Sequence, residues 1–206
     1  MNIKHILSLL TLVALLASCG GDVSQPKPQT YLRIDLPEHN YTVVDTVRLP
    51  DSVGGKTFVL PYHLEMNTLA TVSEGKQDNQ GTGIVINYAQ WNADMELFYL
   101  PLGGKNNLND LMRDVQRRLE REHQKADAPD DIESLDFPEN HVQAIVWHIN
   151  GRDVACTYMF IATDSTDHAL FGSFIINQVP DKDLLSPVLD YLQADASHLL
   201  QTLRWK

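Results

Sequence analysis

The sequence has few basic residues. Its 206 residues include 16 Lys and Arg against 27 Asp and Glu, so the formal net charge is −11. Nucleic-acid binding draws most of its affinity from basic side chains that neutralise phosphates, and no basic patch along the chain offsets this charge. The composition therefore excludes nucleic acid as an expected partner. It predicts either partners with basic surfaces or little electrostatic attraction to anionic lipid headgroups.

Cysteine is nearly absent, since Cys19 and Cys156 are the only two. At most one disulfide could form, so the chain is not a small scaffold held together by disulfides. Hydrophobic residues make up 43% of the chain and charged residues 21%, which excludes wholesale disorder. A length of 206 residues is ordinary for one compact domain with its own hydrophobic core.

Long hydrophobic runs are missing as well. The apolar run from Ile6 to Leu16 has 11 residues, which is too short to span a bilayer as a helix but fits the apolar region of a signal peptide. Lys4 precedes this run, and Leu16-Ala17-Ser18-Cys19 ends it. This order is typical of a bacterial lipoprotein signal, in which the peptidase cuts between Ser18 and Cys19 and the Cys19 thiol receives lipid. The sequence thus predicts a signal peptide over residues 1–18. The alternative is an N-terminal core helix that contains a cysteine by chance.

Residues 19–30 contain glycine, serine and proline but almost no apolar side chains, so they are predicted to form a lipid-anchored tether. An extended tether of this length reaches about 35 Å, which keeps the fold near the membrane surface. Its acyl chains, palmitate among them, make the attachment effectively permanent. Only Asp22 is acidic directly after Cys19, and this favours a periplasm-facing leaflet over the cell surface. Residues 31–206 then form a single domain, in which Cys156 is the only free thiol.

The pattern of the mature chain favours an α+β fold. Segments rich in β-branched and aromatic residues predict N-terminal strands over residues 41–49, 62–72, 83–88 and 93–100, with a polar loop over 73–83. Segments 141–149, 153–163 and 168–177 predict a C-terminal three-stranded antiparallel meander, because Asn150-Gly151 is a strong hairpin signal. The acidic stretch 126–136 is expected to be a connecting loop.

Two amphipathic helices are expected to cover this antiparallel sheet. Apolar residues recur at helical spacing from Leu108 to Leu119, and Asn106 or Asn107 can serve as the N-cap. The second helix is predicted to begin at Ser186-Pro187, with the serine as N-cap and the proline at the first helical position. Its wide apolar stripe continues to Leu203.

No group of residues forms a recognisable catalytic or metal-binding motif. Asp164, Ser165 and His168 are triad residue types within five positions, but triads are usually assembled from distant parts of a chain and this run is typical of a turn. The histidines lack zinc-ligand spacing, and the acidic run 127–136 lacks the alternating ligands and central glycine of an EF-hand. We therefore expect no enzyme, no cofactor and no metal. A zinc site assembled only in space, a calcium loop and a hydrolase that uses Ser165 remain the alternatives.

Four further residues have structural interpretations. Cys156 lies in an apolar strand pattern and is predicted to be a small buried hydrophobe. Three tryptophans are predicted to anchor the core or an interface rather than to form a sugar-binding platform. They are Trp91, Trp147 and Trp205.

Short motifs spread over nearly the whole mature chain resemble one family. They are Pro26-Lys27-Pro28, residues 31–37, Pro61-Tyr62, the helix from Leu108 to His123 followed by Lys125-Ala126-Asp127, the corner Thr163-Asp164-Ser165-Thr166, Gly172-Ser173, Leu185-Ser186-Pro187 and the ending Thr202-Leu203-Arg204-Trp205-Lys206. In this order they resemble the gliding motility lipoprotein GldD family of Bacteroidetes. The chain departs from the family pattern at Leu60 and Gln90, where members often carry cysteines, and at Arg152 and Asp153, where small or amide residues are usual.

The resemblance implies a membrane-anchored accessory of gliding motility, a process coupled in these bacteria to type IX secretion. It implies partners among the other envelope proteins of that machinery, and no catalytic residues. The chain is thus expected to be a non-enzymatic lipoprotein of the cell envelope that acts through protein–protein contacts. The rival hypothesis is a periplasmic lipoprotein whose sheet and helices enclose a small apolar ligand.

Overall fold

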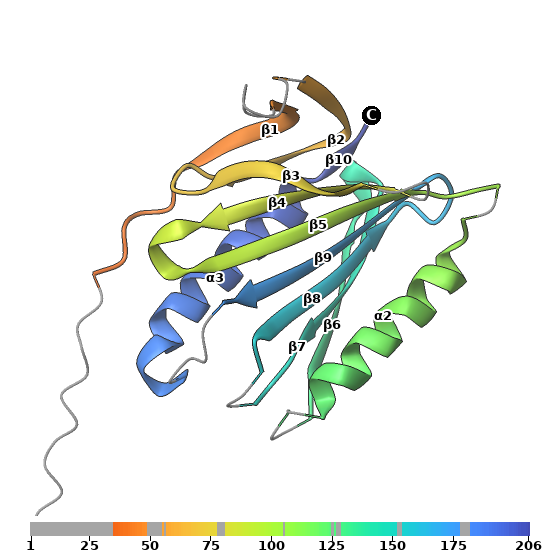
Figure 1. Cartoon of the computed structure of the whole chain (residues 1–206). Helices are drawn as coiled ribbons and strands as arrows, with labels where there is room; N and C mark the ends of the chain where they lie inside the picture. The colour runs from red at the N-terminus through yellow and green to blue at the C-terminus, as the bar shows by residue number, and fades with distance from the viewer. Residues whose placement is uncertain are drawn as a thin grey trace, which may run out of the picture. The chain divides into compact units, whose positions relative to one another are not determined.

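The computed structural model describes residues 35–48, 55, 57–77, 81–104, 106–124, 126, 129–151, 154–177 and 182–206. The predicted signal peptide 1–18, the cleavage site between Ser18 and Cys19 and the tether 19–30 lie outside the described residues. Within these residues lie ten strands and two α-helices (Figure 1). The strands are β1 (Tyr41–Arg48), β2 (Thr57–Asn67), β3 (Thr71–Gln77), β4 (Thr82–Tyr88), β5 (Ala93–Pro101), β6 (Asp131–Phe137), β7 (Val142–His148), β8 (Cys156–Thr163), β9 (His168–Ile176) and β10 (Arg204–Trp205), and the helices are α2 (Leu108–His123) and α3 (Lys182–Thr202).

Seven of the strands form one antiparallel sheet in the order β3-β4-β5-β9-β8-β7-β6. The smaller sheet has the order β1-β2-β10 and is also antiparallel. Strands β7, β8 and β9 follow one another both along the chain and across the sheet, which is the arrangement of a meander. The predicted α+β class, with antiparallel strands and two helices, is therefore confirmed.

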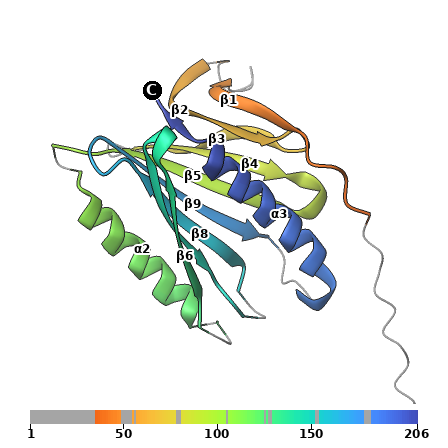
Figure 2. The same cartoon turned by 180° about the vertical axis from the view of Figure 1, so that it is seen from behind.

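One face of the large sheet shares a hydrophobic core with α3 and with the small sheet (Figure 2). Four of its largest fully buried side chains come from four different elements: Tyr62 in β2, Ile86 in β4, Phe160 in β8 and Leu192 in α3. Burial of such side chains is the main favourable contribution to folding. The core therefore unites the N-terminal strands, the meander and the last helix.

The other face of the meander packs against α2. Val115 and Leu119 of the helix form a second buried cluster with Trp147 of β7, Met159 of β8 and Phe171 of β9. Both faces of β8 are thus covered, and all eight of its residues are buried. This explains why apolar residues of β8 point to both faces of the sheet, with threonine only at Thr157 and Thr163, instead of alternating with polar residues.

The two helices begin differently. The side chain of Asn107 accepts a hydrogen bond from the backbone N–H of Asp110, so the predicted N-cap of α2 is confirmed. Helix α3 begins at Lys182, so the predicted start at Ser186-Pro187 is wrong, and Pro187 lies inside the helix. A proline removes one backbone hydrogen bond to the residue four positions earlier, and this loss is least costly near a helix start. Among the helices in the described residues, none is both long and apolar enough to cross a membrane.

Two segments predicted as loops are strands at the edges of the large sheet. Most of the predicted loop 73–83 belongs to β3 and the start of β4, and the last part of the predicted loop 126–136 belongs to β6. Their exposed polar residues, such as Glu74 and Glu133, hid the strand pattern. Charged side chains are common on edge strands because they discourage pairing with other chains.

Candidate functional site

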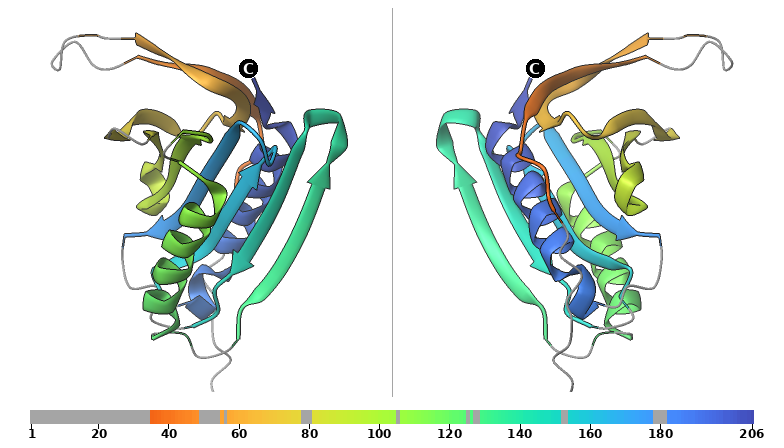
Figure 3. Two further views of the ribbon diagram at one scale, coloured as in Figure 1. Left: turned by 90° about the vertical axis from the view of Figure 1, so that its right-hand side faces the viewer. Right: turned by 90° about the vertical axis from the view of Figure 1, so that its left-hand side faces the viewer.

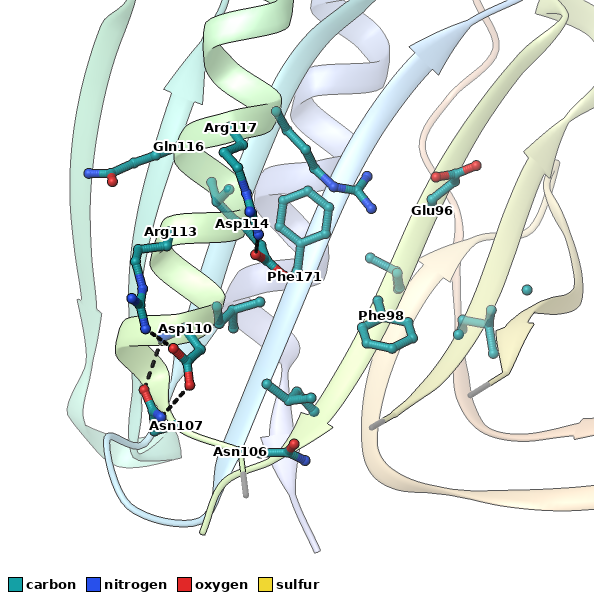
Figure 4. A pocket seen from close by; sticks show the side chains of 18 of the residues that line it. Glu96, Phe98, Asn106, Asn107, Asp110, Arg113, Asp114, Gln116, Arg117 and Phe171 are labelled. Carbon is teal, nitrogen blue, oxygen red and sulfur yellow. Dashed lines mark hydrogen bonds and ion pairs between the residues drawn. The ribbon is translucent and has the colours of Figure 1, made fainter. Parts of the chain in front are cut away.

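A groove of about 790 Å³ lies between helix α2 and strands β4 and β5, and Figure 4 shows the side chains that line it. The apolar stripe of α2 packs mainly over the meander, and Phe98 is the one described residue of β4 and β5 that packs against this cluster. On the same face of β5, Glu96 is exposed and Phe98 is half-buried. The groove therefore exists because one helix covers only part of a seven-stranded sheet.

The floor of the groove is aromatic. Phe98 of β5 and Phe171 of β9 are direct cross-strand partners, and both line the groove. On the other side of Phe98, its partner in β4 is Gly83, which contributes no side chain. Since a larger residue at that position would partly fill the space above β4, the glycine helps to keep the groove open.

The helical wall of the groove carries two internal ion pairs. Arg113 pairs with Asp110, and Arg117 pairs with Asp114, each across one helical turn (Figure 4). All four side chains are largely exposed, so these pairs contribute little to stability. The pairing does, however, neutralise both arginines within the helix itself.

Three other charged residues line the groove and form no ion pair with a described residue: Glu96, Arg118 and Glu120. The guanidinium carbon of Arg118 lies 5.0 Å from the centroid of the Phe171 ring, over the aromatic face. Neither Arg118 of the helix nor Glu96 of β5 forms an ion pair with another described residue. The groove thus offers one cation and one carboxylate on the helix, Arg118 and Glu120, one carboxylate on the strand, Glu96, and an aromatic floor. This set suits a ligand that has an apolar group and charges of both signs.

The structure does not assemble the triad residue types of the sequence into a catalytic site. Asp164 Oδ1 accepts hydrogen bonds from the backbone N–H groups of Thr166, Asp167 and His168, which is the geometry of a turn. Burial alone would raise the pKa of Asp164, but these backbone donors lower it. Ser165 Oγ lies 3.3 Å from Gln143 Oε1.

His168 has a different partner from the one a triad requires. Its Nδ1 lies 2.8 Å from the Tyr99 hydroxyl, and its ring stacks on Trp205 at 5.2 Å between centroids. The imidazole is therefore engaged with β5 and the C-terminal strand rather than with Ser165.

The zinc site and the calcium loop can be tested only over the part of the chain that the structure describes. There, no group of three or more His, Cys, Asp or Glu side chains is arranged to hold a metal ion. His148 lies 3.8 Å from Glu133, and His123 is paired with Asp130. Each of these histidines thus meets a single carboxylate.

The tryptophans occupy structural positions. Trp147 is buried against α2, whereas Trp91 and Trp205 are partly buried against the core on the α3 side. Trp205 Nε1 donates a hydrogen bond to the His141 carbonyl oxygen at 3.1 Å, which ties the C-terminus to the start of β7. The prediction that these residues anchor the core is confirmed.

Cys156 is buried, as predicted, and we expect its thiol to be inert in the folded protein. Burial raises its pKa to about 12, so almost none of the reactive thiolate exists near neutral pH. Iodoacetamide should leave Cys156 unmodified in buffer and modify it fully in urea, with peptide mapping to separate it from Cys19. Rapid modification of the native protein would show instead that β8 opens readily.

A buried polar cluster that was not predicted from the sequence surrounds Asp195 of α3. This carboxylate is only 2% exposed. Its Oδ1 lies 2.7 Å from His39 Nδ1, and it accepts hydrogen bonds from the Tyr41 hydroxyl at 3.1 Å and from Asn67 Nδ2 at 3.0 and 3.2 Å. The available signal was an acidic residue within the apolar stripe of α3, between Leu192 and Leu199.

Aromatic stacking completes this cluster. The His39 ring stacks on Tyr191 at 4.0 Å, and the Tyr41 ring stacks on His198 at 3.6 Å. Burial, and then the charge of Asp195, raise the pKa of the Tyr41 hydroxyl, so it stays protonated and can donate. The cluster fastens the first described segment of the chain to α3. We therefore assign it to stability, and the groove on the opposite face remains the candidate binding site.

Comparison with known proteins identifies the family of the chain. No curated protein matches the chain. The family model described as gliding motility lipoprotein GldD matches residues 21–205, which span both sheets, both helices and every residue that lines the groove. Because this match covers nearly the whole chain, the protein belongs to the gliding motility lipoprotein GldD family.

Proposed function

We propose that the protein is a non-enzymatic accessory of the gliding motility and type IX secretion machinery, anchored by lipid on Cys19 in a periplasm-facing leaflet. Membership of the GldD family supports a lipoprotein associated with gliding motility. The groove beside α2 supports a role in binding, since it presents an aromatic floor and three charged residues, Glu96, Arg118 and Glu120, that form no ion pair with a described residue. The protein acts by holding another envelope protein in this groove.

A polypeptide segment suits the groove better than a purely apolar molecule. Phe98 and Phe171 can contact an apolar side chain, while Arg118 and Glu96 can pair with an acidic and a basic side chain of the same segment. The walls are open and charged rather than enclosed and apolar. The face of the sheet that holds the larger apolar core is already filled by α3.

Charge reversal in the groove should impair function without unfolding the protein. We expect Glu96→Lys and Arg118→Glu each to reduce spreading of a complemented deletion strain severalfold, since each reversal sets like charges against the partner. Colony spreading is the measurement, at equal protein abundance in the membrane fraction. Arg121→Glu is the matched control, because Arg121 is exposed on the same helix but does not line the groove.

The double variant with both reversals separates two explanations. If Glu96 and Arg118 contact a partner, exchanging their charges leaves both contacts repulsive and spreading stays low. If the two residues matter only through attraction to each other, the exchange restores that attraction and spreading recovers. Recovery would therefore contradict a partner in the groove.

A small-ligand role is the second candidate, because a volume of about 790 Å³ lies within the range of ligand pockets. Native mass spectrometry of the protein purified from its host would detect a bound small molecule. Val85→Trp, at a position that lines the groove, should abolish that signal. A ligand that is retained only when the groove is open would favour this candidate over a protein partner.

A further inference from the structure

Strand β6 forms a free edge of the large sheet. It pairs with β7 on one side and is the last strand in the sheet order. Within the described part of the chain, no strand pairs with its outer side, and Figure 3 shows β6 in the green-blue hairpin at the margin of the sheet. Its outward backbone N–H and C=O groups are therefore available to an added strand.

Carboxylates line this edge on the side that faces α3. Asp131 and Glu133 pair in register with His148 and Val146 of β7, so their side chains lie on the α3 face of the sheet. Asp190 of α3 lies across from them. Together they surround a hollow of about 480 Å³, and no Lys or Arg is among the described residues that line it. The hollow is thus acidic from both walls.

Apolar surface is exposed at the same edge. Ile132 is 67% exposed, which makes it one of the most exposed large hydrophobic residues among those described. Leu189 of α3 is half-buried and lines the same hollow. An isolated exposed isoleucine is ordinary, but here it lies on a free strand between two carboxylates.

We propose that the outer edge of β6 binds an extended basic segment of a partner protein by strand addition. Backbone hydrogen bonds to β6 supply affinity, and basic side chains at alternate positions of the segment pair with Asp131, Glu133 and Asp190. An apolar side chain on the other face of the segment covers Ile132. This surface is separate from the groove, and the inference rests on the proposed role in protein contacts.

A second copy of the same chain is a poorer occupant of this edge. Pairing two β6 strands would bring the carboxylates of one copy close to those of the other, and like charges on neighbouring strands are destabilising. The whole chain is also acidic, with a net charge of −11, so a second copy is repelled at longer range. A basic segment, by contrast, is attracted both to the carboxylates at this edge and to the acidic chain as a whole.

The test uses a short peptide of alternating lysine and valine with the full chain in detergent. Amide hydrogen exchange should show new protection in β6, and fluorescence anisotropy gives the dissociation constant. We expect Asp131→Lys/Glu133→Lys to weaken binding about tenfold or more. Glu74→Lys on β3, the edge strand at the opposite end of the sheet, is the matched control and should leave binding unchanged.

Two further peptides make the result decisive. Glutamate in place of lysine should abolish binding, and proline in place of alternate valines should abolish the protection of β6, because proline cannot donate to the strand ladder. Equal binding of the proline peptide, equal binding to the charge-reversed variant, or protection of β6 by concentrated protein alone would overturn the proposal. None of these outcomes involves the groove variants, so failure here leaves the proposed function untouched.

Discussion

Replacing Asp195 by alanine is expected to lower the free energy of unfolding by about 4 kcal/mol. The carboxylate is buried and accepts hydrogen bonds from Tyr41 and Asn67, with His39 as a third neighbour at 2.7 Å. Removing the acceptor takes the carboxylate partner from the fully buried Asn67 amide and from the partly buried Tyr41 hydroxyl and His39 ring at once, and the buried polar groups left under-satisfied carry a desolvation cost. The substitution also leaves a cavity between α3 and β2.

Urea denaturation followed by circular dichroism measures this loss. Glu65→Gln is the matched control, because Glu65 accepts from His198 of the same helix at 2.8 Å but is partly exposed. We expect that control to cost less than about 1 kcal/mol. A loss of that small size for Asp195→Ala would contradict the role assigned to the cluster.

Replacing Gly172 by alanine is the second large expected effect, with a loss of about 3 kcal/mol. Gly172 of β9 is the cross-strand partner of Phe160 in β8, and an added Cβ would lie 2.1 Å from an atom of the Phe160 ring. That ring is fully buried on the α3 side of the sheet. Because its neighbours are close-packed, it can move aside only by displacing the core.

A compensating change tests this explanation directly. Phe160→Leu removes the ring atoms that the new methyl group would meet, so it should cost much less in the Gly172→Ala background than in the wild type. A double-mutant cycle from urea denaturation gives the interaction energy, which we expect to exceed about 1 kcal/mol. Strictly additive effects would show that the clash is not the cause.

The parts of the fold that follow from the sequence are those with local signals. Helix α2 could be predicted because its apolar residues recur at helical spacing after a capping asparagine, and Val115 and Leu119 are indeed the buried ones. The meander follows from three apolar segments separated by turn residues. These signals lie within a few residues of each other, so no knowledge of distant packing is needed.

The wrong predictions for β6 and for the start of α3 have a common physical cause, which is contact with residues that are distant in the sequence. Strand β6 looks like an acidic loop because its exposed side chains need not be apolar at a sheet edge. Helix α3 begins before Ser186-Pro187, although that dipeptide has the typical form of a helix start. Strand β6 is fixed by its pairing with β7, and in α3 Leu185, just before the dipeptide, packs against the core.

The candidate groove could not be predicted from the sequence. Phe98 and Phe171 come from strands that are far apart along the chain and meet only because β5 pairs with β9. Arg118 reaches this place only because α2 crosses the opposite face of the meander. The Asp195 cluster likewise combines residues from the segment before β1, from β2 and from α3. Family membership, by contrast, was predictable from the order of short motifs and is confirmed.

The central claim is that this lipoprotein serves the gliding motility and secretion machinery, and deletion of its gene tests that claim most directly. Colony spreading and the secreted proteome are measured together in the deletion strain and in the strain complemented with the wild-type gene. We expect deletion to reduce both, and complementation to restore both. In a host that does not glide, loss of secretion alone is the expected result. Unchanged spreading and an unchanged secreted proteome would contradict the account.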